Sequence, residues 1–558
     1  MKTSSQQDVL KAIPLGGHGE IGKNSWLFEY KNEIIIVDFG MMLPSQGVTG
    51  VDLVFPSTIY LKQNEEKIKG LILTSAHDDS SGGVSYLLQK VKIQKIWGSK
   101  LALETIGKDS INNVSTEELT PRKEIQIGEN FIIKPYHNTF VLPDSYGLII
   151  QTGTGNILYT GLFKIDQTPP DGMLLDYFSC AQAGEDGVDL LISDSRDIEN
   201  KGYSHSEQKV SKRFDEIFKE TKSRIIIVGY ASNLHKYQII FNLAQKNNKK
   251  VFICSEYLNN KIQAAVRTGF FKIDKNTLVL EKDLQEVDDK DLVILACGKY
   301  GDFISCLIEI SKQEHKIIKL KPKDTIVISA NPPPGTVRLL AHTIDQLFIE
   351  KVQVTSGKGT HVLGHAAQEE VKFMLTVTKP RAFAPSHGEE RHLVIHETLA
   401  ENIGINPNDI HILKNGEILE LRDTVVKRAG KIQAESIYYN QAQGLDIDET
   451  TMLERQTLSI EGTITVGLTV DSERNIIAGP EIFAEACAFA KGKDWRAFCL
   501  GTIELIKDAV KQFNERGEKD ILNLKSLIRD TVNKNVLELI GKRPLINIAI
   551  QEIAEVKR

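Results

Sequence analysis

The chain has 558 residues, of which 41% are hydrophobic and 25% charged, and its formal net charge is −6. This length exceeds what one hydrophobic core supports and predicts about two to four domains with the composition of an ordinary soluble protein. A globally basic nucleic-acid binder is excluded, although basic residues along one surface could still bind a polyanion. No apolar run reaches the roughly 18 residues of a membrane span, and the polar start Met1–Gln7 lacks the apolar segment of a signal peptide.

The cysteines favour a reducing compartment. Six are scattered along the chain and none forms a Cys-x-x-Cys pair, which argues against a zinc ribbon and against a disulfide framework. They are Cys180, Cys254, Cys297, Cys306, Cys487 and Cys499. Free thiols of this kind are typical of cytoplasmic proteins, so we expect a cytoplasmic location.

Residues 8–200 are predicted to be rich in β-strands. The short apolar runs that indicate strands are Glu33–Asp38, Leu71–Thr74, Ser145–Gln151, Asn156–Thr160 and Leu190–Ile192. Two of these runs flank Thr152–Gly155, whose two glycines are typical of a β-hairpin turn.

After about residue 205 strands alternate with helices. The predicted strands are Arg224–Tyr230, Val251–Cys254, Asp291–Cys297 and Thr325–Ala330. A predicted helix follows each of them: Ser232 and Asn233 cap the first helix, and Pro332–Gly335 starts the last. Such alternation predicts a mainly parallel sheet with helices on both faces.

The remaining chain is predicted to complete one domain and to form another. Residues 361–430 contain a helix at 365–379, a strand at Arg381–Pro385 and a helix at Glu389–Asn402, whereas 430–455 is polar, lacks periodicity and is interpreted as a linker. Residues 456–558 are predicted to be a small α+β domain. Its strands are Thr463–Val470, Asn475–Ile482 and Leu545–Ile550, with helices near 496–515 and 520–540.

The segment Thr74–Gly83 is the strongest candidate for metal chemistry. It follows a predicted strand and contains His77, Asp78 and Asp79 before two glycines. A loop after a strand lets several side chains converge, and zinc needs lone pairs from imidazole, thiolate or carboxylate with one position left for water. The segment is similar to the metallo-β-lactamase signature, in which the strand ends in His-x-His-x-Asp-His.

Further blocks resemble, in the same order along nearly the whole chain, those of the ribonuclease J family. They are Ile13–Asn24, Asp38–Gly40, Val51–Pro56, Leu142–Ser145, Thr160–Asp166, Ser193–Ser195, Tyr230–His235, His361–Ala366, Pro385–Glu389, Ile477–Glu481 and Lys542–Pro544. The family consists of 5′→3′ exoribonucleases with some endonuclease activity that act in RNA processing and decay. Its members bind two zinc or manganese ions, and they often coexist as two paralogues that associate.

The resemblance implies an α/β fold. It consists of a metallo-β-lactamase αββα sandwich, an inserted β-CASP (Rossmann-like) domain and a small C-terminal α+β domain. The expected boundaries are 1–205 and 356–430 for the sandwich, 206–355 for the insertion, 431–455 for the linker and 456–558 for a dimerisation domain. The resemblance also implies an RNA partner, and a homodimer or a hetero-oligomer with an active paralogue.

The resemblance also shows which metal ligands are retained. Three of seven ligand positions keep a ligand, as His77, Asp79 and His387. The other four positions hold Ser75, Ser80, Phe140 and Leu162. In two-metal hydrolysis a bridging carboxylate holds both ions about 3.5–4 Å apart, and a leucine in its place cannot.

Neither ion would keep the three protein ligands typical of a catalytic zinc centre. The chain therefore resembles the second, less active paralogue with a degenerate metal site, and we expect no metal or one weakly bound ion. Nearby His137, Asp78 and Asp166 are poorly placed as substitutes. His18, in the glycine-rich turn, leaves a rescued single-metal site open, although retention without metal is the favoured interpretation.

The residues expected to contact RNA lie in a second set of blocks. The resemblance places His361, Val362, Leu363, Gly364 and His365 near the scissile phosphate. The block precedes a helix, so its backbone amides and imidazoles could face the phosphate. Ser232, Asn233, Asn331 and Gly335 lie at strand-to-helix turns, the usual ligand edge of such a sheet. His365 and Asp194 are the possible catalytic residues. An ordinary helix cap at Ser232 and a simple turn residue at Asp194 stay open.

Three hypotheses remain. The first is a weak or non-catalytic ribonuclease J paralogue that binds single-stranded RNA and pairs with an active one. The second is an active metal-dependent 5′→3′ exoribonuclease with a reorganised site. The third is an assembly subunit that no longer binds RNA. Loss of four ligands favours the first over the second, and the retained block His361–His365 favours the first over the third.

Overall fold

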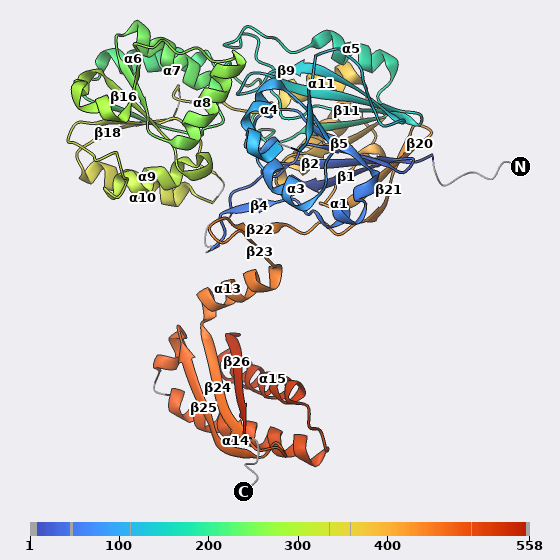
Figure 1. Ribbon diagram of the computed structural model, residues 1–558, viewed down its shortest axis with the longest axis vertical. Helices are drawn as coiled ribbons and strands as arrows, with labels where there is room; N and C mark the ends of the chain where they lie inside the picture. Colours follow the sequence, from blue (N-terminus) through green and yellow to red (C-terminus); the bar gives the residue numbers. More distant parts are fainter. Residues whose placement is uncertain are drawn as a thin grey trace, which may run out of the picture. The chain divides into compact units, whose positions relative to one another are not determined.

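The computed structural model describes residues 8–44, 48, 50–111, 113–333, 335–357, 359–492 and 494–553. The polar start Met1–Gln7 and Pro334, which were part of the sequence interpretation, lie outside them. The chain divides into two compact units (Figure 1). The first contains the chain up to Leu43 and Leu53–Ile437, and the second contains Pro44–Asp52 and the chain from Tyr438 onward.

Two sheets form the sandwich of the first unit. The eight-stranded sheet has, in spatial order, β21 (Val425–Lys431), β20 (Glu417–Arg422), β1 (Leu10–Gly16), β2 (Ser25–Tyr30), β3 (Glu33–Val37), β5 (Ile68–Leu73), β6 (Lys95–Gly98) and β7 (Ser115–Glu118). The six-stranded sheet has β19 (Ala382–Ser386), β12 (Leu190–Asp194), β11 (Gly155–Tyr159), β10 (Ser145–Thr152), β9 (Phe131–Asn138) and β8 (Ile125–Ile127). A short strand, β4 (Leu53–Phe55), follows β3 in the chain.

The facing sides of these sheets form one apolar core. Trp26 and Phe28 of the first sheet belong to the same buried cluster as Leu148 and Ile150 of the second. Alternate residues of each strand enter the core because successive side chains point to opposite faces. Helices α5 (Tyr177–Asp186), α11 (Gln368–Thr378) and α12 (Glu390–Asn402) pack on the outer face of the second sheet. The sandwich also contains helices α1 (Ile59–Gln63), α2 (Asp78–Ser81), α3 (Val84–Lys90) and α4 (Lys100–Thr105).

A parallel sheet is inserted between β12 and β19. Its order is β15 (Leu278–Val279), β14 (Lys250–Ile253), β16 (Leu292–Ala296), β13 (Ile225–Val228), β17 (Thr325–Ile328) and β18 (Gln353–Ser356), and each pair is parallel. Helices α6 (Lys209–Glu220) and α7 (Leu234–Lys246) lie on one side of it and α9 (Phe303–Ser311) and α10 (Val337–Ile349) on the other (Figure 1). Helix α8 (Glu256–Thr268) follows β14.

The second unit has a core of its own. Strands β25 (Ile476–Glu485), β24 (Thr463–Val470) and β26 (Leu545–Glu552) form its sheet, and helices α14 (Trp495–Glu515) and α15 (Ile521–Ile540) pack on one face. The segment interpreted as a linker instead contains β22 (Ile437–Asn440), β23 (Leu445–Ile447) and helix α13 (Glu449–Glu461), in which Asp448 caps the helix. The strands have four and three residues, too few for a sequence pattern to reveal them.

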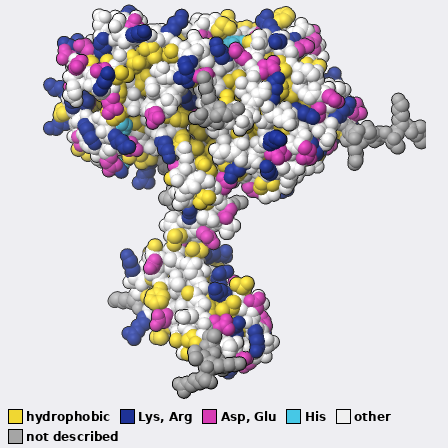
Figure 2. Space-filling view, in the orientation of Figure 1, with side chains coloured by type: hydrophobic (Ala, Val, Ile, Leu, Met, Phe, Trp, Pro, Cys, Tyr) yellow, Lys and Arg dark blue, Asp and Glu magenta, His cyan; other side chains and the backbone are white. Residues whose placement is uncertain are grey.

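The predicted fold class is confirmed as a two-sheet α/β sandwich, an inserted parallel-sheet domain and a C-terminal α+β unit. Among the described residues, no helix is long and apolar enough to cross a membrane. Acidic and basic side chains are interspersed over the face of the first unit seen in Figure 2, as the net charge of −6 leads one to expect.

Candidate active site

The candidate residues meet where strands of both sheets end. His77 follows β5 of the first sheet, whereas Asp194 ends β12 and His387 follows β19 of the second. Strands β12 and β19 are parallel, and Asp194 is paired with Ser386, directly before His387. The fold therefore brings together residues that are about 300 positions apart in the sequence.

His77 and Asp79 are retained but already engaged. His77 caps the short helix α2, and its Nδ1 accepts a hydrogen bond of 3.2 Å from the backbone N–H of Asp79. Burial lowers the pKa of His77, so its imidazole is neutral at pH 7. The neighbouring Asp78 points elsewhere, to Lys261 Nζ at 2.8 Å and to the Tyr257 hydroxyl at 2.6 Å on α8.

Arg196 forms an ion pair with the retained carboxylate. Its Nη1 lies 3.1 Å from Asp79 Oδ2, and its side chain is 28% exposed. Asp79 is 18% exposed, so this pair lies at the border between the interior and solvent. The guanidinium thus balances the negative charge of Asp79, as a bound metal ion would do in a metal site.

His387 forms part of a buried chain of polar groups. Its Nε2 lies 3.1 Å from the Tyr159 hydroxyl, which donates a hydrogen bond of 3.1 Å to Asp38 Oδ2. Asp38 also accepts hydrogen bonds from the backbone and hydroxyl of Thr74. Burial raises the pKa of Asp38 to about 7 and lowers that of His387 to about 3.

Two of these hydrogen-bonded residues, Asp38 and His387, have left-handed backbone conformations. Asp38 has a φ of 60° and His387 a φ of 55°, values that few non-glycine residues adopt and that persist only where surrounding contacts hold them. His18 lies beside these groups, buried and in a T-shaped contact with Trp26. Neither of its ring nitrogens has a hydrogen-bond partner of ordinary geometry, and the backbone of Gly16 is the polar group that acts on the ring from close by. His387 Nδ1 is likewise unpartnered.

The four substituted ligand positions line the same region. Phe140 packs edge-on against both His77 and His365, with ring centroids 5.4 and 5.0 Å apart. Leu162 is buried, and its backbone carbonyl accepts from Asn138. Ser75 and Ser80 are buried too, and Ser75 Oγ accepts from the His77 amide at 3.3 Å. Phe140 and Leu162, which the resemblance places at ligand positions, are thus buried apolar side chains beside His77 and His365 or close to Asn138.

His365 and Asp194 form a close pair. His365 Nδ1 lies 2.6 Å from Asp194 Oδ2, and the backbone N–H of His365 donates to Asp197 Oδ2 at 2.9 Å. Burial raises the pKa of Asp194 to about 6 and lowers that of His365 to about 3. The two groups were expected near the active site, and the structure brings them into direct contact.

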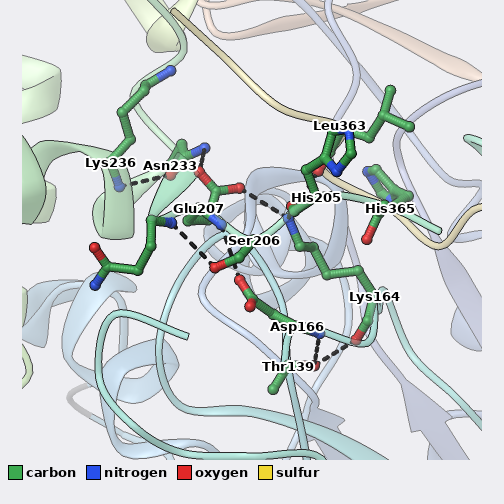
Figure 3. A network of polar contacts seen from close by, with 12 residues as sticks. Thr139, Lys164, Asp166, His205, Ser206, Glu207, Asn233, Lys236, Leu363 and His365 are labelled. Carbon is green, nitrogen blue, oxygen red and sulfur yellow. Dashed lines mark hydrogen bonds and ion pairs between the residues drawn. The ribbon is translucent and has the colours of Figure 1, made fainter. Parts of the chain in front are cut away.

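A buried network joins the sandwich to the inserted domain (Figure 3). Lys164 Nζ contacts Glu207 Oε1 at 3.2 Å and donates to the carbonyls of His205 and Leu363. Glu207 Oε2 accepts from Asn233 Nδ2 at 3.2 Å, and Asn233 caps α7 by accepting from the Lys236 amide. Leu363 lies in the predicted RNA-facing block, so this network fixes that block to both domains.

The other residues predicted to contact RNA make fewer contacts with this network. His361 is half-buried, with Nδ1 3.5 Å from Thr360 Oγ1, and Asn331 and Gly335 are exposed. Val362 is half-buried, and a side chain at Gly364 would contact Val141. The cap of α7 is Asn233, whereas the backbone carbonyl of Ser232 accepts from the Leu234 amide.

Helix α11, which follows the block His361–His365, begins with amides that are not free to bind a phosphate. Its first amides donate to other groups of the chain. The Ala367 amide donates to Glu370, Gln368 to the Asn200 carbonyl and Glu369 to the Gly202 carbonyl. The site must therefore offer side chains rather than these amides to a phosphate.

The sequence interpretation missed four functional candidates. They are Asp38, Lys164, Arg196 and Glu207. Asp38, Lys164 and Arg196 lie in or beside blocks that were singled out, whereas Glu207 does not. A charged residue directly after a buried strand is the signal that could have identified Asp38. Lys164 and Glu207 carry no such signal because their burial depends on tertiary packing.

Family models cover most of the chain. Residues 18–161 match the metallo-β-lactamase superfamily and 222–347 match the ribonuclease J β-CASP domain. Residues 358–412 match the RNA specificity domain of Zn-dependent metallo-hydrolases, and 450–553 match the ribonuclease J C-terminal domain.

Whole-chain relatives agree with these matches. The chain is 38% identical over 491 residues to ribonuclease J of Synechocystis, covering 86% of this chain and 76% of the relative. It is 30% identical over 560 residues to ribonuclease J2 of Bacillus subtilis, covering 99% and 100%. The chain belongs to the ribonuclease J family.

Among solved structures, a protein of unknown function from Enterococcus faecalis shares the fold. Its TM-score is 0.51 at 14% identity, and the match covers 74% of this chain and 100% of that one. The ribonuclease J family comprises Zn-dependent metallo-hydrolases, so the donor set here has to be compared with a metal centre.

The residues present do not fit a two-metal centre. Within the described part of the chain, no three His, Cys, Asp or Glu side chains are grouped so that they could hold a metal ion. The retained Asp79 is paired with Arg196, His77 Nδ1 accepts a backbone hydrogen bond, and His387 Nε2 contacts Tyr159. Catalytic zinc needs about three protein ligands.

Proposed function

We propose that this ribonuclease J-type protein binds single-stranded RNA and that its own metal-dependent hydrolysis is weak or absent. The observation that carries the proposal is the Arg196–Asp79 ion pair together with Phe140 and Leu162 at former ligand positions. Without bound ions, the site lacks the groups that in two-metal hydrolysis generate hydroxide at neutral pH and clamp the attacking and leaving oxygens.

RNA binding rests on the retained block that follows the inserted domain. His361–His365 is held by Lys164 and Asp197, and the match to an RNA specificity domain begins at residue 358. We further propose that residues 456–558 pair the chain with itself or with an active paralogue. In such an assembly the partner would cut the RNA that this subunit holds.

One observation favours a second candidate, an active 5′→3′ exoribonuclease with a reorganised site. His18 has two buried ring nitrogens without partners, and His387 has one. Buried polar atoms normally find partners, so a single ion or an ordered water bound between these rings would satisfy them. A one-metal hydrolase built on His18 and His387 is the competing arrangement.

Digestion of 5′-monophosphorylated, end-labelled RNA by the pure protein with added Mn²⁺ or Zn²⁺ tests these alternatives. We expect no 5′→3′ shortening, intact gel-shift binding and fewer than one transition metal per chain by elemental analysis. The matched control is His18→Ala/His387→Ala. Shortening that disappears in this variant would replace the first proposal by the second. Two ions per chain would refute the expected low metal content, and with it the first proposal.

A further inference from the structure

Helix α2, between β5 and α3, carries two carboxylates, and each of them forms an ion pair with a basic side chain. Asp78 contacts Lys261 at 2.8 Å and Asp79 contacts Arg196 at 3.1 Å. The cations differ in accessibility, because the Lys261 side chain is 10% exposed and that of Arg196 is 28% exposed. Lys261 also donates to the Ala76 carbonyl, so it fixes the loop, whereas part of Arg196 reaches solvent.

Arg196 stands where the two domains of the first unit meet. It lies two residues after β12 of the sandwich. It is also close enough to Tyr230, which follows β13 of the inserted sheet, for its positive charge to offset part of the rise that burial causes in the pKa of Tyr230. Two further carboxylates near it in the chain attract its charge without forming an ion pair with it. Asp194 pairs with His365 Nδ1, and Asp197 accepts from the His365 amide. Asp79 is therefore its one direct ion-pair partner among the described residues.

A guanidinium can serve two anions at once. It presents five N–H donors in a planar fork, and this geometry matches phosphate as well as carboxylate. A single N–H of Arg196 is used by Asp79. A phosphodiester could thus contact the exposed side of the fork while the pair with Asp79 persists, or displace Asp79 from it.

We propose that Arg196 is the phosphate-binding cation of this site and takes over, in binding RNA, the charge that metal ions supply in an active metallo-hydrolase. This inference rests on the proposed RNA-binding function and deepens it. It predicts that RNA binding needs no metal, depends on Arg196, and is opposed rather than helped by Asp79.

Affinity for a 5′-monophosphorylated single-stranded RNA, measured by fluorescence anisotropy in EDTA at several KCl concentrations, tests the inference. We expect Arg196→Ala to weaken binding at least fivefold and to reduce the slope of log K against log [salt] by about 0.7, the value for one phosphate contact on a single strand. Arg196→Lys should retain part of the affinity because it keeps the charge but not the fork.

Asp79→Asn gives the opposite sign. Removing the competing carboxylate frees the guanidinium, so RNA affinity should stay equal or rise about two- to fivefold. If Asp79 instead held a metal that binds RNA, the same substitution would weaken binding in a metal-containing buffer. Weaker binding of Asp79→Asn together with unchanged binding of Arg196→Ala overturns the inference.

Arg381→Ala is the matched control. Arg381 pairs with the buried Asp189 at 3.3 Å, beside the opposite ends of β12 and β19. Its removal should leave the RNA affinity and the salt slope unchanged.

If Arg196→Ala fails to fold, the double variant Asp79→Asn/Arg196→Gln replaces it. This variant removes both charges together and is compared with Asp79→Asn, relative to which the same fivefold loss of affinity is expected. If the wild-type protein binds no RNA, the proposed function itself is refuted. If the wild-type protein binds RNA and Arg196→Ala binds it with the same affinity and salt slope, only this inference is refuted.

Discussion

Four buried histidines of the first unit share one electrostatic property: burial lowers the imidazole pKa to about 3 or about 4. They are His18, His365, His387 and His396. Each is neutral in the folded protein near pH 7, whereas an unfolded chain takes up a proton near its usual pKa of about 6.5. The folded state therefore loses stability as the pH falls from about 6.5 toward 3, by up to about 1.4 kcal/mol per pH unit for each histidine.

His396 offers a test of this pH dependence away from the candidate metal residues. Its Nδ1 lies 2.8 Å from Ser195 Oγ, its Nε2 has no partner, and its ring packs against Phe383. His396→Gln should be less stable than wild type at pH 8, but its unfolding free energy should fall less steeply below pH 6.5, by up to about 1.4 kcal/mol per pH unit. Urea unfolding at pH 8, 6 and 5 measures both effects.

The control for this variant is His342→Gln, which removes an exposed histidine of α10 and leaves the buried set intact. It should reproduce the wild-type pH profile. An equal pH slope for His396→Gln and wild type would mean that His396 is not protonated preferentially in the unfolded chain.

At the scale of elements, the ion pair between Lys164 and Glu207 connects the loop after β11 to the start of α6. Both side chains are essentially unexposed, at 0% and 1%, and Lys164 also donates to two backbone carbonyls. Removing one member of a buried pair leaves the other charge without compensation, which typically costs about 3–5 kcal/mol. Breaking this pair is therefore costly at the junction of the two domains, whereas replacing both partners by apolar residues would cost less.

Lys164→Met should accordingly lower the unfolding free energy by about 3–5 kcal/mol, and Lys164→Met/Glu207→Leu should recover much of this loss. Denaturant titration followed by far-UV circular dichroism measures the difference. Lys379→Met is the control, because Lys379 pairs with Glu185 at 3.3 Å on the surface, where both side chains are more than two thirds exposed. Such a pair contributes at most about 1 kcal/mol. Equal losses for Lys164→Met and Lys379→Met would contradict this account.

The same elements show how far the sequence predicts the structure. Regular alternation of strands and helices identified β13, β14, β16 and β17, and the apolar run at Thr463–Val470 identified β24. Residues within one short segment, such as His77 and Asp79, also stay together in space. Arg196 could not be assigned to the site in this way because its partner Asp79 lies 117 positions earlier. Only the packing of the two sheets brings them together.

At the scale of the whole molecule, the second unit has a sheet with one covered face and one open face. Ile464, Val466 and Leu468 of β24 are buried under α14 and α15. Thr465 lies between two of these residues and is paired with Phe483 of β25, which is 56% exposed. Side chains alternate along a strand, so Thr465 and Phe483 belong to the open face. Aromatic residues are enriched at interfaces, so this position is the one on the open face that we test for association.

If the proposed pairing through residues 456–558 uses this open face, Phe483→Glu should weaken it, because a carboxylate would have to be desolvated there. We expect light scattering to give a lower mass than for wild type at the same concentration, and a chain ending at Ile447 to be monomeric. The control is Leu522→Glu, at an equally exposed apolar position of α15, 69% exposed but on the helical side of the sheet. If the mass falls for Leu522→Glu and not for Phe483→Glu, the contact lies on the helices. If the truncated chain still associates, the contact lies outside the second unit.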